Sequence, residues 1–316
     1  MTEVIPATGA MLPGIFRARH DSARNGLTRR AHTQLHTALK KTPWGERSQR
    51  TFVLVRSGSV LASAECYDMH GMLNGRSFPL VGIGSVCCEP SSRGSAAAVV
   101  LIESLSRDTE TPLTLLFPSA ALNDLEVEGF DPMPRTEVIV RVIEDMRRGA
   151  PMPTVRGGEA RDLPAIAAMG RTRADGFRFC LEREPDFIQY VMARQRLLAG
   201  LGSANTRELQ FFIAEEGVTA AAYVAISAAN GTWTLEECGD RDPTGARVGA
   251  LLQALIAREP SLERPEIRTS LPPGFLPPQM AIVSSQPAAS VIRMAARRNV
   301  ATFGPGDVLY WPNDVL

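Results

Sequence analysis

Hydrophobic and polar positions along the first half of the chain predict a mixture of helices and strands. Helical periodicity covers residues 10–20, 28–39 and 96–105, and a short helix is expected at 120–128. Runs rich in β-branched and aromatic residues predict strands at 3–6, 51–55, 60–66, 80–88, 113–117 and 137–143. Asn74-Gly75 predicts a tight hairpin, because both residues of such a turn need positive φ. The first half is therefore expected to be an α/β unit.

The second half repeats this order of elements. Strands are expected at 153–156, 209–214, 219–227, 232–237 and 267–271, and helices at 161–169, 182–199, 246–257 and 288–297. Landmarks of the first half recur after about 155 residues: Gly58, Asn74-Gly75 and Pro90 correspond to Gly217, Asn230-Gly231 and Pro243. We expect an internal duplication with domains at 1–147 and 153–316. The Pro- and Gly-containing stretch 147–153 is the expected linker.

Composition and charge narrow the classes of function. The chain has 316 residues, 44% of them hydrophobic and 22% charged, as in ordinary globular proteins. Its 34 basic and 34 acidic residues give no net charge, so neither nucleic acid nor an acidic membrane is an expected partner. No segment has the length of a transmembrane helix, and the first residues lack a signal-peptide pattern. The five scattered cysteines favour a reducing cytoplasm.

A turn of small residues at 93–98 has the composition of a phosphate-binding loop. Here a strand is expected to run into a helix, whose first backbone N–H groups and dipole favour an anion. Small side chains let a phosphate touch the backbone, although close helix packing is an alternative reason for them. The turn consists of Arg93, Gly94, Ser95, Ala96, Ala97 and Ala98.

The order of elements and three passages of sequence resemble the GNAT N-acyltransferases, present here as a tandem pair. The passages are residues 81–105, 113–130 and 156–169. The segments KTPWG and ASAECYD of the first half also resemble a lysine-acetyltransferase-like subgroup. The resemblance implies an α/β fold of two tandem GNAT-like domains, each a mixed, mostly antiparallel sheet flanked by helices.

The resemblance also implies acetyl-CoA, or another acyl-CoA, as co-substrate of the first copy. The family pattern in the loop is Gln/Arg-x-x-Gly-x-Gly/Ala. Arg93 and Ala98 match it, whereas Ala96 replaces the central Gly. The second copy, residues 246–251, keeps a Gly but lacks the first Arg, and Leu251 is expected to crowd a phosphate there. The second copy is therefore expected to be degenerate.

In this family the fourth strand diverges from the fifth and leaves a wedge for pantetheine. The resemblance places the wedge at residues 84–88, whose free backbone groups would pair with pantetheine amides and stabilise an oxyanion. We assign Val86, Cys87, Cys88 and Ser119 to cofactor binding. Cys87 and Cys88 point to opposite faces, so one of them is expected to face the thioester. A nucleophilic cysteine and simple strand packing are the two alternatives.

Acyl transfer to an amine also needs a proton acceptor. Glu65 and Glu89 are the candidates near the expected wedge, with exposed strand-end charges as the alternative. Many GNAT enzymes have a tyrosine as general acid where this chain has Leu125, and Tyr67 or Tyr310 is the nearest replacement. The expected reaction is direct attack of a small-molecule amine or a lysine on acyl-CoA. A non-catalytic acyl-CoA-binding or interaction module is the alternative.

No metal is expected. His32 and His36 are four residues apart, as two ligands on one helix would be, but no third ligand is evident, so a solvated helix face is expected. Gly82-Ile-Gly84 lacks the third glycine of a dinucleotide-binding fingerprint. Trp44 is a candidate for an acceptor pocket or simply for an anchored loop.

Overall fold

The chain folds into two compact units in the computed structural model. Unit 1 comprises residues 1–133, 290–303 and 315–316, and unit 2 comprises residues 134–289 and 304–314. The structure describes residues 2–22, 26–89, 96–108, 111–119, 127–143, 154–203, 206–229, 231–260, 265–288, 291–296, 303–304 and 306–316. The expected division at 147–153 stays a prediction, since residues 144–153 lie outside this part. No helix in the described part is long and apolar enough to cross a membrane.

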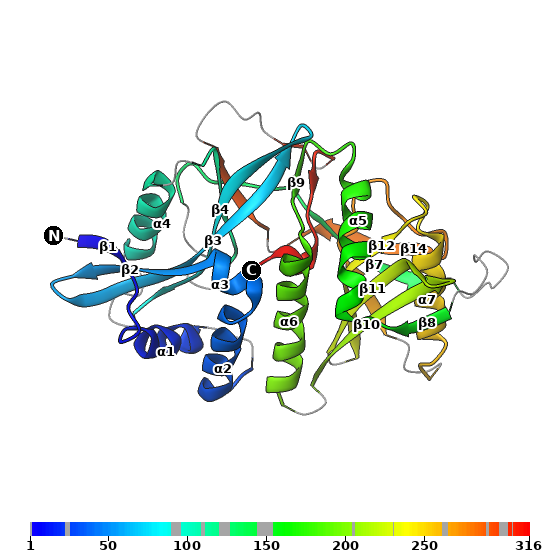
Figure 1. Cartoon of the computed structure of the whole chain (residues 1–316), viewed down its shortest axis with the longest axis horizontal. Helices are drawn as coiled ribbons and strands as arrows, with labels where there is room; N and C mark the ends of the chain where they lie inside the picture. Colours follow the sequence, from blue (N-terminus) through cyan, green and yellow to red (C-terminus); the bar gives the residue numbers. More distant parts are fainter. Residues whose placement is uncertain are drawn as a thin grey trace. The chain divides into compact units, whose positions relative to one another are not determined.

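Unit 1 contains a twisted sheet in the order β1-β2-β3-β4-β5-β15-β6. Its strands are β1 (Thr2–Pro6), β2 (Gln49–Arg56), β3 (Ser59–Leu73), β4 (Arg76–Cys88), β5 (Leu113–Leu116), β6 (Asp131–Pro132) and β15 (Arg293–Ala296). The β4–β5 pair is parallel and the other pairs whose register is defined are antiparallel. As Figure 1 shows, α4 (Ala97–Asp108) lies on one face, and α1 (Leu12–Ser22), α2 (Arg29–Lys40) and α3 (Pro43–Ser48) lie on the other.

Unit 2 contains a second sheet with the order β14-β7-β13-β12-β11-β10-β8. Its strands are β7 (Thr136–Val142), β8 (Thr154–Gly157), β10 (Arg207–Glu216), β11 (Thr219–Ala229), β12 (Thr232–Asp240), β13 (Glu266–Thr269) and β14 (Met280–Pro287). Again one pair, β12–β13, is parallel. The helices are α5 (Leu163–Ala174), α6 (Pro185–Leu201) and α7 (Ala246–Ile256), and β9 (Phe179–Leu181) pairs with β16 (Val308–Leu309).

Each sheet takes one strand from the other half of the sequence. The predicted strand at 137–143 is confirmed as β7, but it pairs with β13 and β14 in unit 2. The predicted helix at 288–297 is wrong: residues 293–296 form β15, between β5 and β6 of unit 1. The sequence Arg-Met-Ala-Ala favours a helix by propensity, and pairing on both sides overrides that preference. The predicted helix at 120–128 falls mostly on residues outside the described part.

Candidate functional site

Pairing between the fourth and fifth strands of unit 1 ends partway along β4, where the family resemblance places a wedge. Parallel pairing between β4 and β5 runs from Val81 to Ile83 and ends with a hydrogen bond from Phe117 N to Ile83 O of 2.8 Å. Beyond Ile83, β4 continues to Cys88 with no strand partner on that side among the described residues. The backbone of 84–88 therefore extends beyond the end of the β4–β5 ladder, where a wedge is expected.

A β-bulge interrupts β4 at the start of this wedge. Glu65 pairs with Gly84 and Ser63 pairs with Cys87, so Ser85 and Val86 stand opposite Ala64 alone. Ser85 has a φ of 49°, in the left-handed region that L-residues seldom adopt. Bulges of this kind re-aim backbone and side-chain groups next to functional sites. The bulge is one feature that the sequence did not predict.

Because of the bulge and the strand pleat, the predicted wedge residues lie on both faces of the sheet. Val86 and Cys88 pack into the hydrophobic core beside α4, together with Ala97 and Ala98. Cys87 faces α1, where its Sγ lies 3.7 Å from Ser22 Oγ. Helix α4 starts beside the wedge, with its first bond from Val100 N to Ala96 O at 2.9 Å.

Part of the predicted phosphate loop lies outside the described residues. Arg93, Gly94 and Ser95 belong to the stretch 90–95, and Leu125 belongs to 120–126. Their roles stay predictions. Of the remaining cofactor residues, Ser119 follows β5, and its Oγ is buried without a hydrogen-bond partner among the described residues. An orphan hydroxyl at the mouth of the wedge fits a site for a ligand with amide or phosphate groups.

Glu65 is held by two donors on the α1 face of the sheet. Its carboxylate accepts a hydrogen bond from Arg19 Nη1 and bonds of 3.0 Å from Thr51 Oγ1 to each oxygen. Arg19 and Glu65 are only 4% and 2% exposed. Sequence reasoning missed Arg19, because nothing local marks a partner 46 positions away. The other candidate base, Glu89, is half-buried just beyond β4.

Tyr67 belongs to an aromatic cluster against β4. Its ring stacks on Trp44 with centroids 5.9 Å apart and meets Phe117 edge-on at 6.0 Å. A Cβ on Gly84 would lie 3.2 Å from the Tyr67 ring and 3.3 Å from the backbone oxygen of Leu316. The sequence did not predict that Leu316 lies here. Tyr310, the other candidate acid, belongs to unit 2, where Arg135 lies 5.4 Å above its ring.

The buried thiols of Cys87, in the expected wedge, and of Cys66, on β3, are disfavoured as thiolates. Burial raises the pKa of the Cys87 thiol, and burial also raises the pKa of Cys66 to about 12. The thiolate is the nucleophilic form, so burial works against a cysteine nucleophile. Cys87 instead donates weakly to Cys88 O at 3.4 Å.

Unit 2 also has a parallel strand pair that ends early and a bulge beside it. Side chains of unit 2 itself occupy the corresponding position. Pairing of β12 with β13 ends at Leu235, and Glu236 forms a bulge opposite β11. Directly after the bulge, Glu237 accepts hydrogen bonds from Arg183 and from Asn313, the latter at 3.1 Å. Asp314 Oδ1 lies 2.9 Å from Arg183 Nε. A buried ionic cluster therefore occupies this wedge.

The N-terminus of α7 is also occupied. Asp240 Oδ2 accepts hydrogen bonds from the backbone N–H groups of Arg247 (2.8 Å) and Val248 (3.3 Å). The Arg247 side chain pairs with Glu216 at 2.6 Å and lies 3.3 Å from Asp240. This carboxylate has the position and charge of a bound phosphate. Leu251, expected to crowd a phosphate, packs in the hydrophobic core.

Three histidines gather between α1 and α2. The Nε2 atoms of His32 and His36 are 3.2 Å apart, and the His20 ring lies 5.7 Å from that of His32. The expected solvated face is wrong for His32, which is 2% exposed. Burial, with His20 and Arg19 adding to the effect, lowers the pKa of His32 to about 4. Among the described residues, no group of three or more His, Cys, Asp or Glu is arranged to hold a metal ion.

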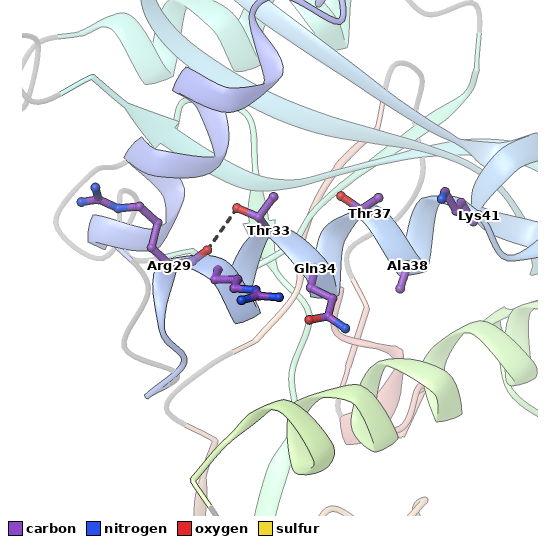
Figure 2. A pocket seen from close by; sticks show the side chains of 7 residues that line it. Arg29, Thr33, Gln34, Thr37, Ala38 and Lys41 are labelled. Carbon is purple, nitrogen blue, oxygen red and sulfur yellow. Dashed lines mark hydrogen bonds between the residues drawn. The ribbon is translucent and has the colours of Figure 1, made fainter.

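A shallow hollow lies on the outer face of α2 and contains none of the predicted site residues. Figure 2 shows its polar lining along one helix, where Thr33 Oγ1 bonds back to Arg29 O at 3.1 Å. Its volume is about 740 Å³, and it is lined by Arg29, Arg30, Thr33, Gln34, Thr37, Ala38 and Lys41. A smaller cavity of about 280 Å³ in unit 2 is lined by residues that include Arg135, Ser270 and Tyr310. Neither shares residues with the wedge.

Comparison with solved structures identifies the fold. A GCN5-related N-acetyltransferase from Kribbella flavida matches with a TM-score of 0.65 at 16% identity, over 94% of this chain and 72% of that chain. A protein from Enterococcus faecalis V583, described as a probable N-acyltransferase, matches with 0.64 at 14%, over 94% and 73%. A GCN5-related N-acetyltransferase from Anabaena variabilis matches with 0.64 at 12%, over 93% and 72%.

These matches confirm the predicted fold class, an α/β protein with two mostly antiparallel sheets flanked by helices. No family model matches the sequence, and no curated protein matches it. At such low identity, the likeness concerns the fold alone.

Proposed function

We propose that the chain is an acyl-CoA-dependent N-acyltransferase whose active site is the wedge of unit 1. The observation that carries the proposal is the end of β4–β5 pairing after Ile83, with a bulge at Ser85–Val86 and the start of α4 beside it. The edge of a strand that extends beyond its neighbour suits the amides of pantetheine. A helix start suits a pyrophosphate. The fold neighbours are described as N-acetyltransferases or a probable N-acyltransferase, which agrees with this proposal.

The proposed reaction is direct attack by a neutral primary amine. The amine nitrogen bonds to the thioester carbon, the C–S bond breaks, and CoA leaves as a thiolate that takes a proton from solvent or a nearby hydroxyl. The nitrogen loses one proton to a base. A backbone N–H of the bulged strand would stabilise the oxyanion. No acyl-cysteine forms, because burial keeps the Cys87 thiol protonated.

We assign the base role to Glu89, acting directly or through water. The oxygens of the alternative, Glu65, already accept hydrogen bonds from Arg19 and Thr51, so Glu65 is better suited to hold its neighbours in place. Tyr67 remains the candidate acid, held by stacking on Trp44. The acceptor is a small-molecule amine or a lysine, and cytoplasmic location stays a prediction from the cysteines.

Unit 2 is proposed to be a degenerate copy of the same domain. Its helix end is satisfied by Asp240, and its wedge holds the cluster of Arg183, Glu237 and Asp314. An acyl-CoA phosphate would have to displace a buried carboxylate. We therefore expect one acyl-CoA site per chain.

The test is release of free thiol from acetyl-CoA in the presence of a panel of primary amines. Amine-dependent release by the intact chain, reduced at least about tenfold by Glu89→Gln, is expected for a general base. The matched control is Glu103→Gln on α4, whose carboxylate pairs with Arg107 Nη2 at 2.8 Å on the surface. Binding of acetyl-CoA without turnover of any amine would favour the alternative, a non-catalytic acyl-CoA-binding module.

A further inference from the structure

The guanidinium of Arg19 has one side paired and one side open. Nη1 donates to Glu65, whereas Nε and Nη2 are buried and have no hydrogen-bond partner among the described residues. These two nitrogens form the edge of a guanidinium that offers parallel N–H donors to a carboxylate. A buried donor without a partner costs free energy, so an open edge of this kind calls for an explanation.

Two contacts place Arg19 beside the β4 bulge. Glu65, which holds Arg19, pairs with Gly84 just before the bulge. Ser22, one helical turn after Arg19 on α1, lies against Cys87 just after it. The positive charge of Arg19 also acts to lower the pKa of Cys87 and of His32, which shows that it lies near both side chains. Arg19 thus lies on the α1 side of the proposed wedge.

We propose that the Nε and Nη2 edge of Arg19 binds the carboxylate of the acceptor, so that the acceptor class is amino acids. This inference rests on the proposed function. The charges of these groups agree with an amino-acid acceptor. The positive charge of Arg19 and the negative charge of Glu65 cancel, and a zwitterionic amino acid adds no net charge to the buried pair. Glu65 and Thr51 act as positioning residues that fix the guanidinium plane. A simple amine without a carboxylate leaves both donors unsatisfied.

The test compares matched acceptors, L-phenylalanine with 2-phenylethylamine and L-leucine with 3-methylbutylamine, in the thiol-release assay with acetyl-CoA. The amino acid is expected to have the higher kcat/KM by about 10- to 100-fold, the range for a charge-assisted hydrogen-bond pair. Arg19→Lys keeps a cation beside Glu65 but lacks the two-donor edge. It should remove most of the preference, because it lowers kcat/KM for the amino acids more than kcat/KM for the simple amines. Arg17→Lys, at an exposed position of the same helix, is the control.

Binding of the products gives a readout that needs no turnover. Calorimetry should show N-acetyl-L-phenylalanine binding in an Arg19-dependent manner and more tightly than N-(2-phenylethyl)acetamide. If binding shows this pattern but no amine is acetylated, the carboxylate site stands and the proposed function fails. If amines are acetylated without a preference for the carboxylate, the proposed function stands and this inference fails. An equal loss of kcat/KM for both acceptors in Arg19→Lys would show that the Arg19–Glu65 pair has a purely structural role. The double variant Arg19→Met/Glu65→Gln checks that the fold survives removal of this ion pair.

Discussion

Cys87 lies at the reacting end of the proposed wedge, yet its surroundings disfavour nucleophilic chemistry. It is 2% exposed, and burial raises the pKa of its thiol. We expect Cys87→Ala to retain acyl transfer within a few-fold. Mass spectrometry after incubation with acetyl-CoA alone should find no acyl group on this residue. A stable Cys87 thioester, or loss of turnover in Cys87→Ala with an unchanged fold, would contradict direct attack.

The buried His32 makes the stability of unit 1 sensitive to acid. Its pKa is lowered from 6.5 in the unfolded chain to about 4 in the folded protein, chiefly by burial. The folded state therefore binds fewer protons than the unfolded state in this window. The stabilising contribution is complete above pH 6.5 and is lost as the pH falls towards 4. The expected loss is about 1–3 kcal/mol.

Urea unfolding of the wild type, His32→Gln and His70→Gln at several pH values measures this effect. His32→Gln should flatten the fall in unfolding free energy between pH 6.5 and 4. His70 is exposed on β3, so His70→Gln should behave like the wild type. Identical pH profiles for all three proteins would show that His32 is not the titrating group.

At the scale of elements, the carboxylate of Asp240 satisfies backbone donors at the N-terminus of helix α7. Asp240 accepts from two backbone N–H groups of its first turn, at 2.8 and 3.3 Å. Asp240→Asn keeps the shape but removes the charge, and should lower the free energy of unfolding by about 1–2 kcal/mol. Asp175→Asn, at an exposed position after α5, is the matched control and should have little effect. Equal stability of the two variants in urea would contradict a structural role for this carboxylate.

Elements set by local chemistry were predictable from the sequence, whereas those set by distant partners were not. The turn at Asn74-Gly75 has φ values of 50° and 75°, as the prediction required. Strand β15 escaped prediction because its partners, β5 and β6, are far away along the chain. The family resemblance implied the wedge, but nothing in the sequence indicated Arg19. Its function depends on Glu65 from another element.

At the scale of the whole molecule, the exchange of β7 and β15 ties each sheet to both halves of the sequence. Residues 1–147 alone lack β15, which stands between β5 and β6 of unit 1. The same fragment carries β7 away from its partners β13 and β14. An exposed, unpaired strand is prone to aggregation.

We therefore expect a chain truncated after residue 147 to be insoluble or unfolded, even though the duplication in the sequence suggests a separable domain. Co-expression with residues 148–316 should restore a soluble complex, since together the two pieces supply every strand. Circular dichroism measures whether each of the two preparations is folded, and size-exclusion chromatography measures whether it is soluble and assembled. A stable, cooperatively unfolding fragment 1–147 would show that β15 is dispensable to unit 1.

The most direct measurement is a calorimetric titration of acetyl-CoA into the intact protein, with Arg93→Glu and Arg76→Glu as matched charge reversals. Arg93 belongs to the predicted phosphate loop, and Arg76 is exposed at the other end of β4. We expect one acetyl-CoA per chain with a Kd near the micromolar range, about −8 kcal/mol. Arg93→Glu should weaken binding at least about tenfold through loss of a phosphate contact, and Arg76→Glu should leave it unchanged. Absence of binding, two molecules per chain, or equal binding by both variants would contradict a single acyl-CoA site in unit 1.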